Sequence, residues 1–526
     1  MLLHQMVDQA ALRHPESPAA RCDGETLTYE QLARRANGLA RLLLETGVQR
    51  RGRVAVLLNK GLNVPVSFYG VMAAGASLVP IDPRSPAATV ARIVRSTGAT
   101  HLVSERGKRE TVAKVVRECP TVAHVVGLEA EEDETLPCHP WTAVDELATD
   151  RQPEVAVIEL DPSYILHTSG STGIPKLIQH THRSAMGFLD WAVSEYSLTR
   201  DDRLSNHSSH HTCFATFDYY AAGRAGATTI ILTPAVMMMP GSLSSLMEKE
   251  GISVWYSVPT ALVQLSLRGD LEARDLSALR WVLFAGETFP EKHLRRLMAQ
   301  LPEARFSHVY GSTEVNVCAY FHLPTGSDLD FPLPIGKPCS NSVLEVAGSD
   351  LEPVASGEVG ELLVRGSTVM SGYWGDAERN REVLIRRPAA GGLEEVYYRT
   401  GDRSRVRSDG NLAFVARSDL QVKVRGHRVE LEEIEAALLS LAAVEEAAVF
   451  TVPESEGSSA IQAVVVAAKS AEWSRQEALS SLKELLPPYC LPASISQVDS
   501  LPRTPTGKVD RNALRDRLQE PGEMLR

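Results

Sequence analysis

The sequence predicts an α/β protein with a large N-terminal domain of mostly parallel, helix-covered sheets, a β-rich subdomain, and a small α+β domain at the C-terminus. Three observations support this prediction. Strand-like and helix-like segments alternate as far as Tyr310, glycine-punctuated strands follow after about Pro338, and a compact unit begins near Asp419. The chain has 526 residues, enough for roughly two to four domains.

The alternation begins at residue 53, where an apolar run predicts a strand. Strand-like and helix-like segments take turns at residues 53–58, 68–75, 77–81, 87–98 and 100–104. After an acidic segment at 127–137, which we expect to be a surface loop, the order resumes at residues 228–232, 242–250, 253–259, 291–300 and 306–310. Strands that alternate with helices predict a parallel sheet covered by helices.

The C-terminal part of the chain has a different pattern of predicted elements. Glycine-punctuated strands are expected at residues 356–366 and 399–417. They are followed by a hairpin, a helix, two strands and a second helix, expected at residues 421–430, 431–441, 447–452, 460–468 and 475–486. We therefore expect two domains, over residues 1–417 and 418–526.

Composition and charge exclude several classes of protein. Lys and Arg number 54 and Asp and Glu number 66, so the net charge of −12 has the wrong sign for coating nucleic acid or an anionic membrane. No apolar run approaches the ~20 residues of a membrane span, and the first twenty residues, which include Asp8 and Glu16, lack a secretory core. Seven scattered cysteines without a CxxC pair indicate reduced thiols. We expect a cytoplasmic protein that binds neither nucleic acid nor membrane.

The most informative segment is YILHTSGSTGIPK, from Tyr164 to Lys176. An apolar strand runs into a loop of hydroxyl and glycine residues that ends in a lysine. Glycines turn backbone amides toward an anion, hydroxyls add donors, and Lys176 adds a positive charge, so the segment predicts a polyphosphate-binding loop. The spacing is not that of a Walker A loop, and no G-x-G-x-x-G is present. The alternative is a plain surface connection, which the preceding strand and the Pro-Lys ending disfavour.

This loop resembles the phosphate loop of the adenylate-forming superfamily, which includes acyl-CoA synthetases, firefly luciferase and the adenylation domains of nonribosomal peptide synthetases. The resemblance covers almost the whole chain and is strongest to the adenylation domains. Further motifs follow in the order of that family: LTYEQL (27–32), MAAGASLVPID (72–82), FDYY (217–220), YGSTE (310–314), GELLVRG to SGYW (360–374), YRTGD (398–402), ARSDLQVKVRGHRVELEEIE (416–435), LPPYCLP (486–492) and TPTGKVDR (504–511).

The resemblance implies a reaction with ATP and Mg²⁺, in which a carboxylate attacks the α-phosphate and a thiol then captures the acyl group. It implies that Glu314 binds Mg²⁺ and that Lys508 bridges the substrate carboxylate and the α-phosphate, with Thr313 in the same catalytic set. Tyr310 is expected to pack on adenine, and Asp402 and Arg417 to contact the ribose. The full set implied to bind ATP is Thr168, Ser169, Gly170, Ser171, Thr172, Gly173, Lys176, Gly286, Glu287, Tyr310, Gly311, Ser312, Asp402 and Arg417.

The resemblance also implies that the small domain is a mobile lid. Asp419 matches the hinge position, where a short polar residue takes up the backbone change of a rotation. Ala416 stands where the family has a glycine, which affects the local backbone but not the expected role of Arg417. In one orientation the lid presents Lys508, and in the other the hairpin at 421–430 faces the site.

The expected substrate is an amino acid. Asp218 matches the residue that pairs with the substrate ammonium, since a buried carboxylate needs a cationic partner. The other expected walls of the pocket carry no charge and suit a small to medium apolar side chain; they are Tyr219, Ala222, Tyr256, Leu283, Ala285, Val309, Val317 and Cys318. Tyr219 and Tyr220 depart from the usual FD-x-S-V form and favour a displaced amine, so both an α- and a β-amino acid stay open.

Three alternatives concern the histidines and the reaction. His207, His210 and His211 suggest a metal, but they lack partners at ligand spacing, so a pocket-lining or pyrophosphate-side role is preferred. An acyl- or aryl-CoA synthetase on the same fold is the first rival reading, and Asp218 argues against it. An inactive scaffolding protein is the second, and Lys508 with Glu314 argues against it.

The expected acceptor is a phosphopantetheinylated carrier protein in trans, because no pantetheine attachment site follows the Lys508 motif. Carrier proteins of this type are acidic, so docking requires a locally positive face. The candidates on the small domain are Arg425, His427, Arg428, Arg511, Arg515 and Arg517.

Overall fold

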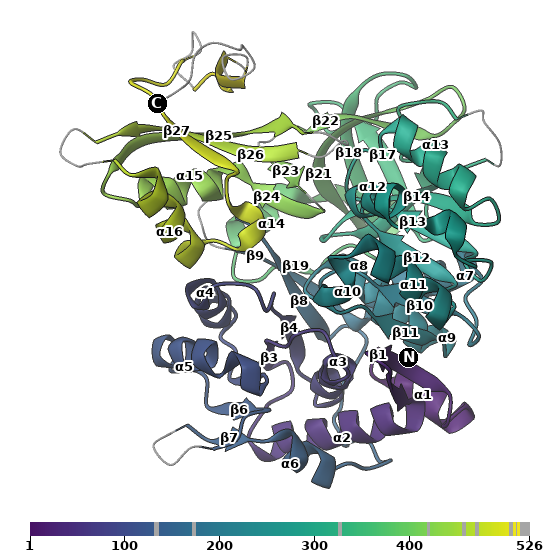
Figure 1. Ribbon diagram of the computed structural model, residues 1–526. Helices are drawn as coiled ribbons and strands as arrows, with labels where there is room; N and C mark the ends of the chain where they lie inside the picture. Colours follow the sequence, from purple (N-terminus) through teal and green to yellow (C-terminus); the bar gives the residue numbers. More distant parts are fainter. Residues whose placement is uncertain are drawn as a thin grey trace.

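The computed structural model describes residues 1–130, 136–170, 175–324, 329–417, 421–424, 426–454, 459–468, 473–503, 509–511 and 513–515. A large N-terminal domain carries a smaller C-terminal domain, which lies against it above helix α4 (Figure 1). The predicted boundary between residues 417 and 418 meets a segment outside the described residues. Among the described helices, none combines the length and apolar character that a membrane span requires.

The first sheet of the large domain has eight strands, in the order β19-β9-β8-β4-β3-β5-β6-β7. Strand β3 pairs in parallel with β4 and β5, and β4 pairs in parallel with β8, whereas β9 runs antiparallel to both β8 and β19. Its strands are β3 (Arg53–Val56), β4 (Ser77–Pro80), β5 (His101–Val103), β6 (His124–Val126), β7 (Cys138–His139), β8 (Pro162–Thr168), β9 (Lys176–Thr181) and β19 (Gly372–Tyr373). The segments that connect these strands or precede them form helices α2 (Tyr29–Glu45), α3 (Asn63–Ala73), α4 (Ala87–Thr97), α5 (Arg109–Glu118) and α6 (Trp141–Glu146). The alternation predicted up to residue 104 is confirmed.

The second sheet has nine strands, in the order β16-β15-β14-β13-β12-β10-β11-β1-β2. Its strands are β1 (Pro18–Cys22), β2 (Glu25–Thr28), β10 (Arg203–Asn206), β11 (Thr228–Ile231), β12 (Val254–Ser257), β13 (Trp281–Phe284), β14 (Arg305–Ser312), β15 (Asn316–His322) and β16 (Lys337–Pro338). Its helices are α1 (Gln5–Arg13), α7 (His182–Glu195), α8 (Cys213–Thr216), α9 (Ala222–Ala225), α10 (Pro234–Met237), α11 (Pro240–Glu250), α12 (Pro259–Arg268) and α13 (Glu291–Gln300).

The predicted strand and helix order from β11 to β14 is confirmed, with one addition. Helix α12 and strand β13 lie between β12 and α13. The sequence pattern predicted only the strand at 253–259 and the helix at 291–300 in this region. Strand β13 has four residues, all buried, and pairs in parallel with both β12 and β14. A run this short and wholly apolar carries no period that identifies a strand.

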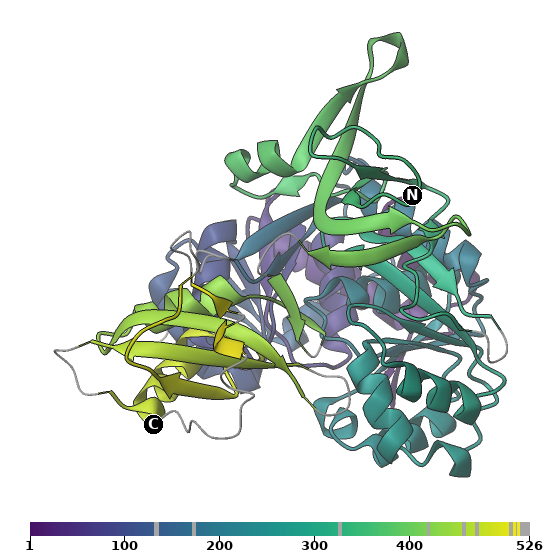
Figure 2. The same ribbon diagram turned by 90° about the horizontal axis from the view of Figure 1, so that it is seen from above.

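The β-rich subdomain is antiparallel and contains β17 (Ser342–Ala347), β18 (Gly360–Gly366), β20 (Leu384–Pro388), β21 (Glu394–Val406) and β22 (Leu412–Arg417), with α14 (Ala377–Val383) beside it. The hairpin of β20 and β21 projects from the body of the molecule, as the green ribbon in Figure 2 shows. The predicted change to glycine-punctuated strands is confirmed.

The small domain, called the lid below, follows the predicted order of hairpin, helix, strands and helix. Its elements are β23 (Gln421–Val424), β24 (His427–Glu430), α15 (Leu431–Leu439), β25 (Val444–Pro453), β26 (Ser459–Ala467), α16 (Arg475–Leu485) and β27 (Ser494–Gln497). Apolar residues of both helices and of the sheet form its own core, among them Ile434, Val449 and Leu482. Thr89 and Arg92 of α4 donate hydrogen bonds to the Leu485 carbonyl, at 3.0 and 2.7 Å, so the lid is docked on the large domain.

Candidate active site

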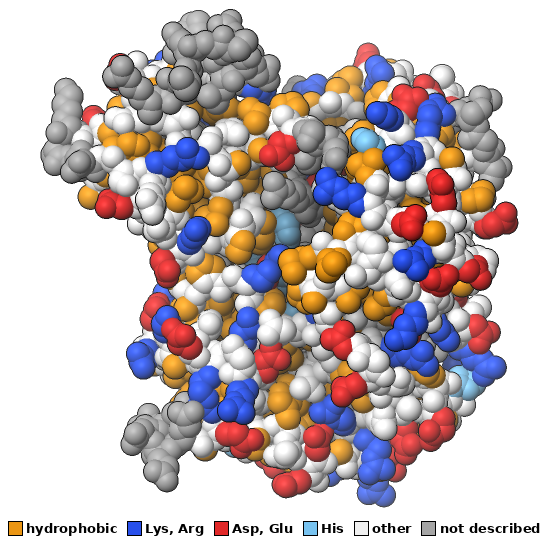
Figure 3. Space-filling model, viewed as in Figure 1, with side chains coloured by type: hydrophobic (Ala, Val, Ile, Leu, Met, Phe, Trp, Pro, Cys, Tyr) orange, Lys and Arg blue, Asp and Glu red, His pale blue; other side chains and the backbone are white. Residues whose placement is uncertain are grey.

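Three adjoining cavities lie where the lid meets the large domain. The nucleotide cavity, of about 430 Å³, is lined by Tyr310, Asp402 and Arg417, the central cavity of about 90 Å³ by Cys213, Tyr256 and Val317, and the outer cavity of about 270 Å³ by Lys60, Arg84 and His210. On the face drawn in Figure 3 the surface is hollowed between the two domains.

The cavities join through shared walls. The nucleotide and central cavities have in common Gly286, Gly311, Asp402, Arg417, Gln421 and Lys423. The central and outer cavities have in common Thr212, Phe214, Gly426 and His427. The central cavity therefore adjoins both the nucleotide cavity and the outer cavity.

The predicted phosphate loop begins where β8 ends, and the lid hairpin binds its first residues. Ser169, which is 6 % exposed, donates its hydroxyl to the Arg428 carbonyl and accepts the Glu430 amide N–H, both at 2.9 Å. The Lys176 ammonium forms an ion pair with the Glu430 carboxylate. Thr168 lines the central cavity, and its buried hydroxyl has no partner among the described residues. Ser171, Thr172 and Gly173 lie outside the described residues.

Glu314 is fully buried at the centre of the site. Nη1 of Arg428 lies 2.8 and 2.7 Å from its two carboxylate oxygens, and the Tyr373 hydroxyl donates to one of them at 2.7 Å. Burial alone would raise the pKa of Glu314, but the Arg428 charge and these hydrogen bonds lower it to about 2. The backbone carbonyl of the neighbouring Thr313 accepts a hydrogen bond from His180 Nε2 at 2.8 Å. Glu314 is thus an ionised carboxylate ready for a cation.

The residues expected to bind adenosine share the nucleotide cavity. The Tyr310 hydroxyl donates to Asp402, and Arg417 forms an ion pair with the same carboxylate. Gly286 and Glu287 line the cavity beside them. Glu287 also accepts the Gly426 amide N–H at 2.6 Å, which ties this wall to the tip of the lid hairpin.

The central cavity agrees only in part with the predicted substrate pocket. Tyr256, Ala285 and Val317 line it, and Val309 lines the nucleotide cavity instead. Its other walls, which the alignment of motifs did not name as substrate contacts, include His167, His211, Cys213, Phe214 and Asn316. The HHTCF stretch just before the FDYY motif is the sequence signal that could have identified three of them, His211, Cys213 and Phe214.

Asp218 is not brought to any of these cavities. It is 0 % exposed, its Oδ2 accepts a hydrogen bond from Asn206 Nδ2 at 2.9 Å, and its Oδ1 has no partner among the described residues. Burial raises the pKa of this carboxyl well above its ordinary range. The residues of the predicted wall that line none of the three cavities are Asp218, Tyr219, Ala222, Leu283 and Cys318.

The reason is the phase of one helical segment. Residues Phe217–Ala221 form a π-helical turn directly after α8. Asp218 lies within this turn, and the Tyr219 ring packs 5.4 Å from that of Phe68 while its hydroxyl donates to Asn206 at 3.1 Å. Cys213 and Phe214, which precede the turn, line the central cavity. Asp218 thus lines none of the three cavities, and its pairing with a substrate ammonium stays a prediction.

The histidines take pocket-lining places, as preferred from the sequence. His207 and His210 line the outer cavity, and His211 lines the central one. Burial lowers the pKa of all three.

Four of the six residues expected to form a positive face for a carrier protein are described, and each has contacts within the protein. Arg428 pairs with Glu314 in the site, His427 lines two cavities, and Arg511 pairs with Glu435 of α15. Arg515 donates to the Thr451 carbonyl at 3.1 Å. The other predicted residues that lie outside the described part of the chain are Arg425, Arg517, Lys508 and Asp419.

A large α/β domain with a small α+β lid docked on it is the fold of the adenylate-forming ligases. The family model described as AMP-binding enzyme matches residues 7–374, and the model of the AMP-binding enzyme C-terminal domain matches residues 433–508. The chain belongs to this family, and the resemblance inferred from its motifs is confirmed.

Relatives and solved structures agree with this assignment. The chain is 33 % identical over 514 residues to the L-proline–(L-prolyl-carrier protein) ligase of Pseudomonas fluorescens, covering 98 % of both chains. It is 31 % identical over 513 residues to the dimodular nonribosomal peptide synthase of Bacillus subtilis, where the match covers 97 % of this chain and 21 % of the synthase. The fold matches the amide bond synthetase McbA from Marinactinospora thermotolerans with a TM-score of 0.84 at 23 % identity, covering 98 % of this chain and 99 % of the other. An artificially fused adenylation-PCP di-domain from Klebsiella oxytoca matches with a TM-score of 0.80 at 22 % identity, covering 95 % and 94 %.

Proposed function

We propose that the protein activates a small to medium apolar amino acid with ATP and transfers it to the phosphopantetheine thiol of a carrier protein. In the first step a carboxylate oxygen attacks the α-phosphorus, and pyrophosphate leaves with the electron pair of the broken P–O bond. In the second step the thiol sulfur bonds to the acyl carbon, AMP leaves, and the thiol proton is released. The full-length similarity to the prolyl-carrier protein ligase supports both steps.

The observation that carries this proposal is the continuous row of three cavities. ATP suits the nucleotide cavity, where Asp402 would contact the ribose hydroxyls and Tyr310 the base. The acid suits the central cavity, where Thr313 and Lys423 would contact its carboxylate. The outer cavity adjoins the central one, as a long thiol arm requires, and Arg84, paired with Asp82, lies on its wall.

Glu314 fits the metal that this chemistry implies. Its carboxylate is buried, ionised and a hard oxygen donor, which suits Mg²⁺ held jointly with phosphate oxygens. The ion would neutralise phosphate charge as it develops. Arg428 occupies the carboxylate while the hairpin is docked, so the metal belongs to the other lid orientation.

A second candidate substrate is a carboxylic acid without an ammonium group. Among the described residues that line the central cavity, the only carboxylate is that of Asp402, and it is paired with Arg417. Cys213 and Phe214 stand on the wall, while Asp218 is buried beside Asn206. An ammonium placed in this cavity would have no anion of its own, which is costly.

ATP–pyrophosphate exchange with matched acids tests both candidates. Each α- or β-amino acid is compared with the desamino acid of the same skeleton. If only the amino acids support exchange, the amino acid is the substrate class. If that exchange is lost in a folded Asp218→Asn variant, Asp218 has a role in binding it. Exchange with the desamino acids only supports the second candidate. Loading of coenzyme A but of no phosphopantetheinylated carrier protein would identify an acyl- or aryl-CoA synthetase instead.

A further inference from the structure

Four aromatic rings form a stack that runs from the large domain into the lid. The ring of His167 lies 5.2 Å from that of His211 at an interplanar angle of 9°. His211 lies 6.4 Å from His427 at 14°, and His427 lies 4.0 Å from Tyr489 at 4°. Such near-parallel arrangements are those in which ring pairs attract one another.

The stack crosses the domain boundary at one point, between His211 and His427. His167 ends β8 and His211 precedes α8, so both belong to the large domain. His427 begins β24 of the lid hairpin, and Tyr489 comes from the lid segment after α16. All four rings line the central cavity, and His427 also lines the outer one. The stack therefore forms the wall where an acceptor thiol would enter.

The surroundings keep the His427 ring neutral. Burial and the nearby Arg84 charge together lower its pKa to about 4, against the opposing effect of Asp82. The Asp82 carboxylate is itself held by Arg84 at 2.8 Å. The facing rings of His211 and Tyr489 add no charge, because burial lowers the pKa of the first and raises that of the second. A neutral ring stacks without the desolvation cost of a buried cation.

We propose that His427 is a positioning residue, which holds the lid in the orientation for thiol transfer by stacking between His211 of the large domain and Tyr489 of the lid. The stacked ring, rather than a proton on its nitrogen, performs this role. The transfer readout below depends on the proposed function, while the proposal about lid orientation stands apart from it.

Two substitutions and a control separate the ring from the imidazole. His427→Ala removes the ring, His427→Phe keeps a ring without nitrogen, and His14→Ala is a histidine deletion at the end of α1, remote from the lid. Lid orientation is read by cross-linking a Lys114→Cys, Glu484→Cys pair with a short bismaleimide, because these two side chains attract each other across the interface. Single-cysteine variants control for the native thiols.

We expect His427→Ala to slow cross-linking and transfer to the carrier protein about five- to tenfold, because one or two ring contacts are lost. Pyrophosphate exchange should fall less than transfer does, since adenylation uses the other orientation. His427→Phe should keep the cross-linking rate, and His14→Ala should keep both activities and the cross-linking rate.

Equal losses in His427→Phe and His427→Ala would overturn the proposal, because the nitrogen and not the ring would then be required. Cross-linking that is unchanged in His427→Ala would also overturn it. If cross-linking follows the expected pattern while the unmodified protein loads no carrier protein, the proposed function fails and the role of His427 in lid orientation stands.

Discussion

Arg428 of the lid places its Nη1 atom 2.8 and 2.7 Å from the two carboxylate oxygens of Glu314 in the large domain. Glu314 is also the residue expected to hold Mg²⁺. If Glu314 holds Mg²⁺ as expected, the docked lid and the metal would compete for the same oxygen atoms.

Replacing Arg428 with alanine should make adenylation less demanding of Mg²⁺. Without the guanidinium, Glu314 is free for the metal, and the docked orientation loses about 3 kcal/mol or more, because a buried charge is left unpaired. We expect half-maximal pyrophosphate exchange at a several-fold lower Mg²⁺ concentration and transfer slowed at least about tenfold. Mg²⁺ titrations of both half-reactions provide the measurement, with Arg428→Lys as the charge-retaining control. An unchanged Mg²⁺ requirement would contradict the competition.

Gly426→Ala should weaken lid docking by a steric clash. Gly426 has a φ of +80°, and an added Cβ would lie 2.6 Å from Val258 Cγ1 in the large domain. We expect transfer to slow at least about tenfold, with pyrophosphate exchange retained, because the clash exists only in the docked orientation. The double variant Gly426→Ala, Val258→Ala relieves the clash but keeps the backbone strain, so it should recover part of the rate. No recovery would show that strain alone is responsible.

Lys508→Ala should slow adenylation and leave thiol transfer largely intact, which is the opposite of the effect expected for Gly426→Ala. The family's mechanism implies that this ammonium stabilises charge on the α-phosphate only during adenylation, where such a group contributes about a hundredfold or more. Pyrophosphate exchange should fall by that factor, while transfer from a supplied acyl adenylate should remain within a few-fold. Single-turnover assays of each step provide the test. Equal losses in both steps would argue against two lid orientations.

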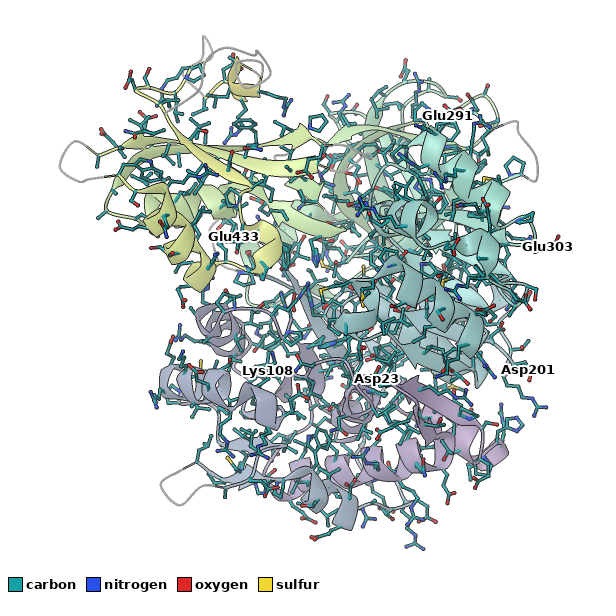
Figure 4. All side chains as sticks on the ribbon, in the orientation of Figure 1. Asp23, Lys108, Asp201, Glu291, Glu303 and Glu433 are labelled. Carbon is teal, nitrogen blue, oxygen red and sulfur yellow. The ribbon has the colours of Figure 1, made fainter. Side chains whose placement is uncertain are left out.

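Glu433 should make the stability of the docked lid depend on pH. It lies on the side of the lid that faces the large domain (Figure 4), near Arg92, Lys176, Glu430 and the Gly170 backbone, and burial raises its pKa to about 7. The docked state thus binds a proton more tightly than the exposed carboxyl, whose ordinary pKa is 4.5. The stabilisation is complete below that value and is lost as the pH rises through 7.

Chemical unfolding of the unmodified protein and of Glu433→Gln, compared between pH 5 and 8, measures this effect. We expect the difference between the two proteins to change by at most about 3 kcal/mol, because the amide cannot ionise. Cross-linking between residues 114 and 484 should show the same trend. Parallel pH profiles of the two proteins would exclude a contribution from Glu433.

The alternation of strands and helices and the residues at strand ends could be predicted from the sequence. Tyr310 and Asp402 lie in strands whose register fixes them, and both line the expected cavity. The surroundings of the Asp218 side chain could not be predicted from the sequence. A π-helical turn changes the direction in which its side chains point, and no residue type indicates where such a turn forms. The pair of Arg428 and Glu314 could not be predicted either, since it joins two domains whose orientation the local sequence does not encode.

Ser169 and Lys176 hold the lid hairpin with the groups expected to hold phosphate oxygens. If these groups bind phosphate as expected, the docked hairpin would compete with ATP for them. The apparent affinity for ATP would then equal the intrinsic affinity multiplied by the fraction of molecules with an undocked hairpin. A change that tightens the hairpin contacts would speed thiol transfer and raise the KM for ATP together, so selection on one half-reaction would act on the other through two side chains.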